Sequence, residues 1–198
     1  MTTLAWHFTA DNTLRDGRAL PPIGETLRHD SPVVPCESGL HASERLIDSL
    51  HYAPGLHLHR VDLGGQIVPH GIPVDKLCAS ERTILWSLPE AVMLPIIVEW
   101  AQVVAMRAVR ETLPAALRSA ADGVSDDDAA MLRGHADRCE AAQDLDTARD
   151  AAWDARDAAW VARAAARAAS AAARDAAWSA ERSWQVERLI SYLDGVSL

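Results

Sequence analysis

The pattern of apolar and polar positions changes near Ser87. Before this residue, short apolar runs rich in β-forming residues alternate with polar ones, which is typical of half-buried strands. After it, long segments carry apolar residues at helical spacing. We therefore expect an α+β protein, with a small mixed β domain over residues 1–87 and an all-α extension over residues 88–198. The pattern predicts strands at residues 4–9, 56–63 and 76–86, and a short strand or loop at residues 25–29.

The segment from Cys36 to Tyr52 is expected to form a glycine turn followed by an amphipathic helix. Gly39 permits a backbone conformation that a side chain would oppose. Ser43 is placed to cap a helix over residues 44–53. His41 would then lie just ahead of the helix, where it either faces a ligand or only hydrogen-bonds the turn. The predicted apolar face of the helix consists of Leu46, Ile47, Leu50 and Tyr52.

The strand at residues 76–86 carries a carboxylate within an apolar pattern. Strict alternation places Glu81 on the same face as Thr83 and Leu85, so we expect Glu81 to point inward or into a cleft. A half-buried carboxylate requires a partner or a chemical role, because leaving it unpaired costs free energy. Glu81 is therefore a candidate site residue.

The helical region begins with a predicted capping box at Ser87–Glu90. Residues 91–113 follow as a helix that is apolar almost all round, and we expect it to be buried. Asp122 and Gly123 interrupt the pattern, and Ser125 is placed to cap a further helix whose first turn is acidic.

Residues 135–194 contain neither glycine nor proline, and the motif ARDAAW recurs within them. Trp153, Trp160 and Trp178 would lie near one helix face, because their spacings of seven and eighteen residues approximate whole turns. Alanine allows close helix approach, with tryptophan as the large filler. We expect these helices to pack on each other or on a second copy, rather than to form a stacking surface for nucleic acid.

Composition and charge exclude several classes of protein. The net charge of −9 argues against general nucleic-acid binding by bulk electrostatics. No stretch of about 18 uninterrupted apolar residues is present, so we expect no membrane span. The first residues lack a secretory pattern, and the three cysteines are few and widely spaced. These features favour a reducing, cytoplasmic location.

Eight histidines raise the question of a metal site. His57 and His59 lie two apart on one predicted strand face, and further candidate ligands are Cys36, His41, His70 and Cys78. No CxxC, HxxxH or HExxH spacing accompanies them. The sequence therefore gives only a weak signal for zinc, and we expect no metal.

Three short motifs follow one another in the β domain: Trp6–Thr9, Ser38–Ser43 and Ser80–Leu85. In this order they resemble the histidine-containing first strand, the glycine segment that leads into a helix, and the late glutamate strand of ADP-ribosyltransferases of the poly-ADP-ribose polymerase and diphtheria-toxin type. The resemblance covers about residues 4–86. It departs from that family at Phe8, where glycine is usual, and at His41, where tyrosine is usual.

The core from Cys36 to Ala42 also resembles an uncharacterised family of phage and bacterial proteins with the pattern C-x-S-G-[FL]-H-A. Some of its members carry Ala/Trp-rich helical tails. No activity comes with this second resemblance.

The transferase resemblance implies NAD as substrate and a catalytic trio of His7, His41 and Glu81. His7 would orient the ribose, His41 would pack against the nicotinamide, and Glu81 would stabilise positive charge as the glycosidic bond breaks. The cofactor-binding residues implied by the resemblance are His7, Thr9, Gly39, His41 and Tyr52.

Two functional hypotheses follow from the sequence. The first is an NAD-dependent ADP-ribosyltransferase-like protein, of phage or mobile-element origin, that modifies an unknown protein target. The alternative is a non-enzymatic interaction or inhibitor protein that works through its helical region and has a degenerate transferase-like fold. In either case the Ala/Trp helices would bind a protein target or form a homo-oligomer. In the enzyme, His7, His41 and Glu81 should converge on one cleft, and the enzymatic hypothesis fails if they point to different faces.

Overall fold

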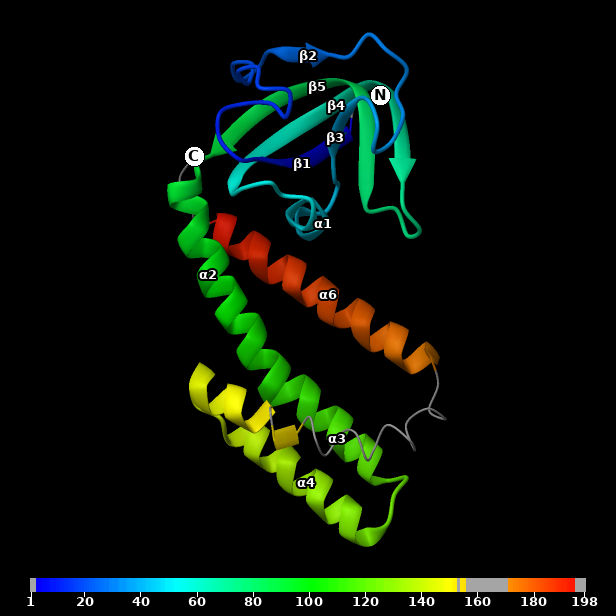
Figure 1. The fold of residues 1–198 in the computed structure, drawn as a ribbon, viewed down its shortest axis with the longest axis vertical. Helices are drawn as coiled ribbons and strands as arrows, with labels where there is room; N and C mark the ends of the chain where they lie inside the picture. Colours follow the sequence, from blue (N-terminus) through cyan, green and yellow to red (C-terminus); the bar gives the residue numbers. More distant parts are fainter. Residues whose placement is uncertain (1–2, 153, 156–170, 195–198) are drawn as a thin grey trace. The chain divides into compact units, whose positions relative to one another are not determined.

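The computed structural model describes residues 3–152, 154–155 and 171–194, with the backbone alone for residues 171–179 (Figure 1). It confirms the α+β class, with the strands before the long helices. The chain divides into two compact units. The β unit consists of residues 1–97 and 185–198, and the helical unit of residues 98–184. The division therefore falls ten residues after the expected boundary at Ser87, and the C-terminal end belongs to the β unit.

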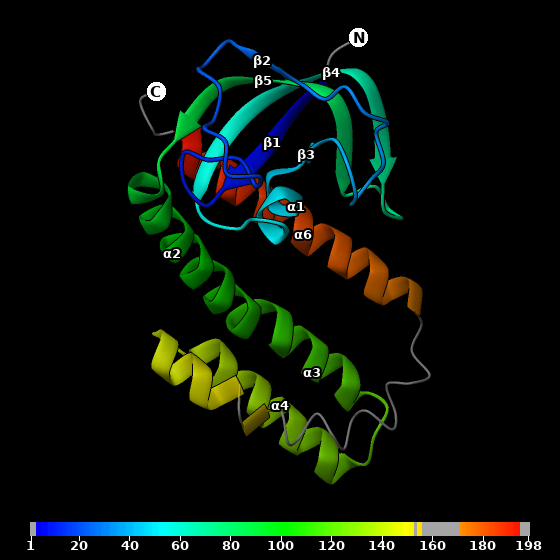
Figure 2. The same ribbon diagram turned by 45° about the horizontal axis from the view of Figure 1, so that its top comes forward.

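The β unit contains one antiparallel sheet with the order β1-β4-β5-β2, and β3 pairs with β5 beside β2 (Figure 2). The long hairpin of β4 and β5 forms its centre. All three longer predicted strands are confirmed, and the segment at residues 25–29 contains a short strand. The strands are β1 (Thr3–Thr9), β2 (Thr26–Arg28), β3 (Leu40–Ala42), β4 (His57–His70) and β5 (Lys76–Leu88).

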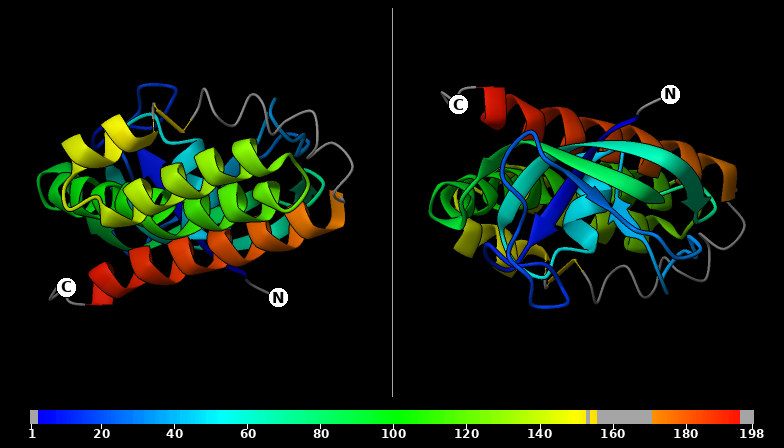
Figure 3. Two further views of the ribbon diagram at one scale, coloured as in Figure 1. Left: turned by 90° about the horizontal axis from the view of Figure 1, so that it is seen from below. Right: turned by 90° about the horizontal axis from the view of Figure 1, so that it is seen from above.

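The sheet curls back on itself, as the curved β4 and β5 show in Figure 3. The backbone N–H groups of Trp6 and Ser43 each donate to the carbonyl of the other residue, at 2.7 and 2.9 Å. These bonds join β1 to the end of β3, so β1, β4, β5 and β3 follow one another around a small barrel. Its apolar interior is formed by Ala5, Ala42, Val61, Leu63, Leu77, Ala79 and Ile84.

Gly64 and Gly65, which bound the predicted strand at residues 56–63, lie inside β4, and residues 66–68 continue the strand after a bend, as the sequence allows. The pairing with β5 shifts between Gly64 and Ile67, which marks a β-bulge. A side chain at Gly65 would lie 2.1 Å from the Ser80 hydroxyl oxygen, which accepts the N–H of Gln66. The two glycines therefore make room for the neighbouring strand and allow β4 to continue through the bend.

Helix α1 (Leu46–His51) is shorter than predicted and begins three residues after Ser43. Arg45 is its N-cap and makes no side-chain capping bond. The prediction of a Ser43 cap is wrong because the backbone of Ser43 pairs with β1. Leu46 is fully buried, but Tyr52 is 42% exposed and does not belong to the apolar face.

A continuous helical stretch follows, made of α2 (Glu90–Arg107), a π-turn at Ala108–Thr112 and α3 (Leu113–Ala121). The predicted Ser87 capping box is wrong, because Ser87 still belongs to β5 and its hydroxyl bonds to His59. The π-turn directly precedes Pro114, whose missing N–H and bulky ring disturb the regular helical pattern.

The prediction that this apolar helix is buried is wrong. By length and composition alone, Glu90–Ala121 is apolar enough to cross a membrane, and only 6% of its most apolar window is buried. A single helix of this kind is weak evidence for a membrane span. Its α2 part also contains Glu99 and Arg107, and inserting charged side chains into a membrane costs free energy. The exposed apolar side chains of α2 include Val92, Leu94 and Val98.

Helix α4 (Asp126–Ala141) begins as predicted, with the Ser125 hydroxyl accepting the N–H of Asp128. Residues 145–152 and 154–155 are also helical. Ala151 of the first ARDAAW motif and Ala155, where the second motif begins, pack in one cluster with Leu132, which confirms close helix approach through alanine. Trp153 and Trp160 lie outside the described residues, as does the side chain of Trp178. The last helix is α6 (Ala171–Asp194).

Candidate functional site

His7 lies on β1 directly opposite His59 of β4, with ring centroids 6.1 Å apart. Burial, followed by electrostatic interaction with Arg82, His59 and His41, holds the pKa of His7 well below its usual range. His7 is therefore neutral at physiological pH. The Arg82 guanidinium influences the pKa values of both His7 and His41, and His41 influences that of His7.

His59 is fully buried between two hydroxyl groups. Its Nε2 lies 2.9 Å from the Thr9 hydroxyl and its Nδ1 lies 2.7 Å from the Ser87 hydroxyl. Thr9 donates its own proton to the carbonyl of Asp11, so it accepts the proton of Nε2. Ser87 then donates to Nδ1. Burial, with smaller contributions from His57 and Arg82, lowers the pKa of His59 to about 3.

Arg82 is the buried charged residue of β5, with 4% of its surface exposed. It donates from one terminal nitrogen to the carbonyl oxygen of His41 at 2.9 Å. Burial lowers the pKa of Arg82 to about 10, and no carboxylate forms an ion pair with it in the described parts of the chain. A guanidinium in this position is charged and incompletely neutralised, which favours an anion beside it.

His41 lies on β3 opposite Cys78, and its Nε2 accepts the backbone N–H of Cys36 at 3.2 Å. Burial is the largest cause that lowers the pKa of His41. Electrostatic interaction with Lys76, Arg82, Arg15 and His70, in that order, lowers it further. We call these four residues together with His41 the His41 patch.

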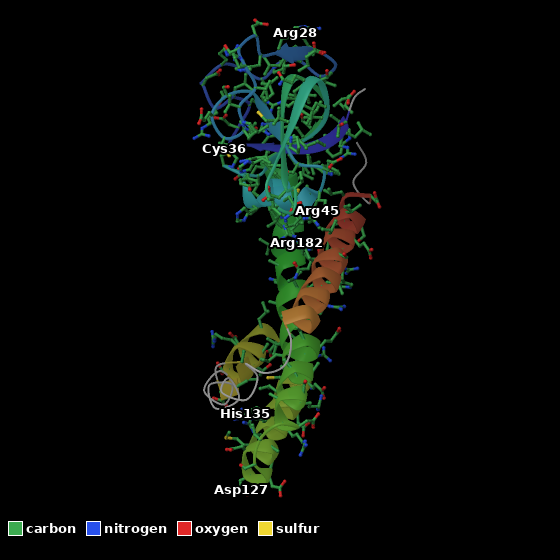
Figure 4. The ribbon with its side chains drawn as sticks, turned by 90° about the vertical axis from the view of Figure 1, so that its right-hand side faces the viewer. Arg28, Cys36, Arg45, Asp127, His135 and Arg182 are labelled. Atoms are coloured by element: carbon green, nitrogen blue, oxygen red, sulfur yellow. The ribbon has the colours of Figure 1, made fainter. Side chains whose placement is uncertain are left out.

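Cys36 places an exposed thiol at the edge of this patch (Figure 4). Its sulfur lies 3.3 Å from the Lys76 ammonium, which donates to it, and 3.5 Å from Nε2 of His70. The Lys76 ammonium also lies 4.1 Å from the centre of the Tyr52 ring, and the Tyr52 hydroxyl donates to Asp75. Lys76 is the only lysine in the chain.

Glu81 does not line the His41 patch. Its carboxylate pairs with Arg28 of β2, and 32% of its side chain is exposed. The alternation argument is wrong here, because the buried positions are the intervening ones, Arg82 and Ile84. Glu81 pairs with Gly64 and His7 pairs with His59, so five residues of β4, or roughly 16 Å, separate the two positions. In Figure 4, Arg28 and Cys36, the partners of Glu81 and His41, lie well apart.

The remaining predicted cofactor-binding residues have structural contacts of their own. Thr9 is buried and holds His59, and Gly39 has φ +118° and packs against Cys78. Tyr52 is exposed and lies under Lys76. The structure thus places Tyr52 beside Lys76 and brings His7 near His41, but Glu81 lies elsewhere with Arg28. The predicted convergence of His7, His41 and Glu81 on one cleft is therefore wrong.

Sequence reasoning missed the two central cations of the patch. The burial of Arg82 could not be predicted, because it depends on the bulge in β4, the strand paired with β5. Lys76 carried a usable signal, since it is the single lysine of an arginine-rich chain and lies two residues before Cys78 in a predicted strand. Among the residues described, no group of three or more histidine, cysteine or acidic side chains is arranged to hold a metal ion.

The fold and the site define a small antiparallel barrel with a cationic patch at one edge. Residues 5–94 match the family model of a domain of unknown function, DUF7666. This match covers β2 to β5, most of β1 and every residue of the His41 patch. No curated protein and no solved structure matches the chain.

Proposed function

We propose that the β unit binds NAD through its phosphate groups at the His41 patch, as an ADP-ribosyltransferase-like protein. The observation that carries the proposal is that three cationic side chains, Lys76, Arg82 and Arg15, act electrostatically on His41, in a chain whose net charge is −9. A local concentration of cations against the overall charge favours a ligand with several negative charges. The motif resemblance supplies NAD as the candidate, and the free cysteines accord with a cytoplasmic location.

The patch offers donors that suit a pyrophosphate. Lys76 presents an ammonium beside Cys36, and Arg82, which is buried and bonded to the His41 carbonyl, adds its positive charge from the interior. Arg15 is exposed and lies in the loop after β1. Glu81, held by Arg28, takes no part in this binding. A catalytic role for Glu81 would require its release from Arg28, so binding and transfer are separate steps of the proposal.

We expect NAD binding to depend on Arg15 and not on Glu81. Removing one charge of the patch in Arg15→Gln should weaken binding about fivefold, the effect of one unit charge at short range in water. Isothermal titration with NAD, ADP-ribose and pyrophosphate measures this. Arg18→Gln is the matched control, because Arg18 is an exposed arginine that pairs with Asp16. Equal weakening by both substitutions, or no binding of any of the three ligands by the wild type, would contradict the proposal.

Transfer is tested with labelled NAD and a lysate as source of acceptors. The wild-type protein, His41→Ala and Glu81→Ala are compared for incorporation of ADP-ribose. A transferase requires loss of incorporation in His41→Ala, and loss in Glu81→Ala would show that Glu81 leaves Arg28 during turnover. Equal signals from all three proteins would dispose of the enzymatic assignment.

A second candidate function is assembly or target binding through the helices. It is favoured by the exposed apolar side chains of α2 and by a groove of about 660 Å³ in the helical unit, bordered among others by Met106, Leu145 and Trp184. Exposed apolar surface of this kind is typical of interaction sites. This candidate requires no NAD and no role for Glu81.

We expect assembly, if it uses α2, to be abolished by charge on its exposed face. Light scattering should give a mass above 21.4 kDa for the wild type and the monomer mass for Leu94→Glu with Val98→Glu. Ala101→Glu with Ala105→Glu, at exposed positions of the same helix that carry small side chains, tests whether charge alone is sufficient. If the wild type is a monomer, self-assembly is excluded, and the helices would have to bind a different protein.

A further inference from the structure

Cys36 occupies the tip of a tight loop that fixes its thiol at the surface. Val34 and Ser38 pair through their backbones, and the N–H groups of Glu37 and Ser38 both donate to the Val34 carbonyl. This closed loop forces Cys36 to φ +69°, a left-handed conformation that non-glycine residues seldom adopt. Such conformations persist where surrounding contacts impose them, and they are concentrated at functional sites.

Two groups from the β4–β5 hairpin face the sulfur. His70 and Lys76 lie directly opposite each other at the end of the hairpin, so the strand register places both beside Cys36. Their nitrogen atoms lie 3.5 and 3.3 Å from the sulfur. The Lys76 ammonium also lies 4.1 Å from the centre of the Tyr52 ring. An exposed thiol, an ammonium and an imidazole thus meet in one place, although they come from distant parts of the sequence.

This constellation has the chemistry of a reactive cysteine. Cysteine reacts as the thiolate, and reactive cysteines are found in partly exposed, electropositive surroundings. The other cysteine of the β unit is the opposite case. Cys78 is buried, donates to the carbonyl of Ser38, and has a pKa raised by that burial. Cys78 is therefore inert, and Cys36 is the accessible nucleophile of this unit.

We propose that Cys36 is a thiol-modification site that takes up small, negatively charged disulfides as mixed disulfides. The Cys36 thiolate attacks one sulfur of the disulfide, a bond forms between the two sulfurs, and the original disulfide bond breaks. The departing sulfur leaves as a thiolate, and the proton of the Cys36 thiol passes to solvent. Lys76 and the rest of the His41 patch attract the negative charge of the disulfide. The inference does not depend on NAD binding.

The test uses 5,5′-dithiobis(2-nitrobenzoate), a disulfide with two carboxylates, and the uncharged 2,2′-dithiodipyridine. We expect a single rapid phase of thiolate release by the full-length protein, with the adduct mapped to Cys36 by mass spectrometry and the phase absent in Cys36→Ser. Lys76→Met should slow the charged probe about fivefold. Arg28→Met is the matched control, because it removes one cation from the same unit at a distance from Cys36 and should leave the rate unchanged.

The charged and uncharged probes distinguish attraction of the disulfide by Lys76 from any effect of Lys76 on the thiol itself. Attraction of the disulfide predicts a larger effect of Lys76→Met on the charged probe than on the uncharged one. A rapid phase that persists in Cys36→Ser, or equal rates for Lys76→Met and Arg28→Met, would overturn the proposal. Failure here is distinguishable from failure of NAD binding, because Cys36→Ser retains the backbone N–H that holds His41 and should bind NAD like the wild type.

Discussion

Replacing Gly39 by alanine should destabilise the β unit by about 2–6 kcal/mol. Gly39 has φ +118°, and a side chain in such a conformation costs about 1–3 kcal/mol. The new Cβ would also lie 2.5 Å from the sulfur of the buried Cys78, and overpacking of this kind costs a further 1–3 kcal/mol or so. Urea unfolding followed by circular dichroism measures the loss.

Gly17→Ala is the matched control for this prediction. Gly17 also has a positive φ, +83°, but nothing lies within 4 Å of its added Cβ, so this substitution isolates the backbone contribution. The double mutant Gly39→Ala with Cys78→Ala removes the clashing sulfur and should recover part of the loss, as a coupled pair does in a double-mutant cycle. A Gly39→Ala protein as stable as Gly17→Ala would show that β3 does not pack on Cys78 as described.

The turn at Gly39 is also where the sequence was most informative. Glycine suits both the conformation and the contact, so its position located the turn and the start of the following helix to within a few residues, although the sequence did not predict β3 (Leu40–Ala42). The alternating segments located β1, β4 and β5 for a similar reason, because a strand that is half buried repeats every two residues. The helix after Asp126 was equally predictable, since a capping serine and an acidic first turn act locally.

Features that depend on contacts between distant strands were not predictable. Ser43 resembled a helix cap, but its backbone pairs with Trp6, which lies 37 residues earlier. The alternation of β5 changes phase at the bulge in β4, so the buried positions include Leu77 and Ala79 before it and Arg82 and Ile84 after it, and Glu81 is not buried. The candidate site also depends on contacts between distant parts of the chain. Cys36, His70 and Lys76 meet because the hairpin register and the loop before β3 coincide in space, and no motif in the sequence links them.

Lowering the pH from 7 to 5 should destabilise the β unit through His59. Its pKa is about 3 in the folded protein and about 6.5 when the chain is unfolded. Because the folded pKa is lower, the unfolded chain binds a proton first, so the stabilisation is complete above pH 6.5 and is lost as the pH falls toward 3. Between pH 7 and pH 5 this linkage amounts to about 2 kcal/mol. The lowered pKa of His7 acts in the same direction.

The substitution His59→Gln separates this contribution from other titrations. Glutamine retains one donor and one acceptor for Thr9 and Ser87 but does not titrate. We expect the variant to be less stable than the wild type at pH 8, yet to lose about 2 kcal/mol less between pH 7 and pH 5. Urea unfolding at half-unit pH intervals gives both curves, which should run parallel above pH 7.5, where the histidine is neutral in both states. Parallel curves down to pH 5 would show that His59 is protonated in the folded protein and therefore is not enclosed between the two hydroxyls.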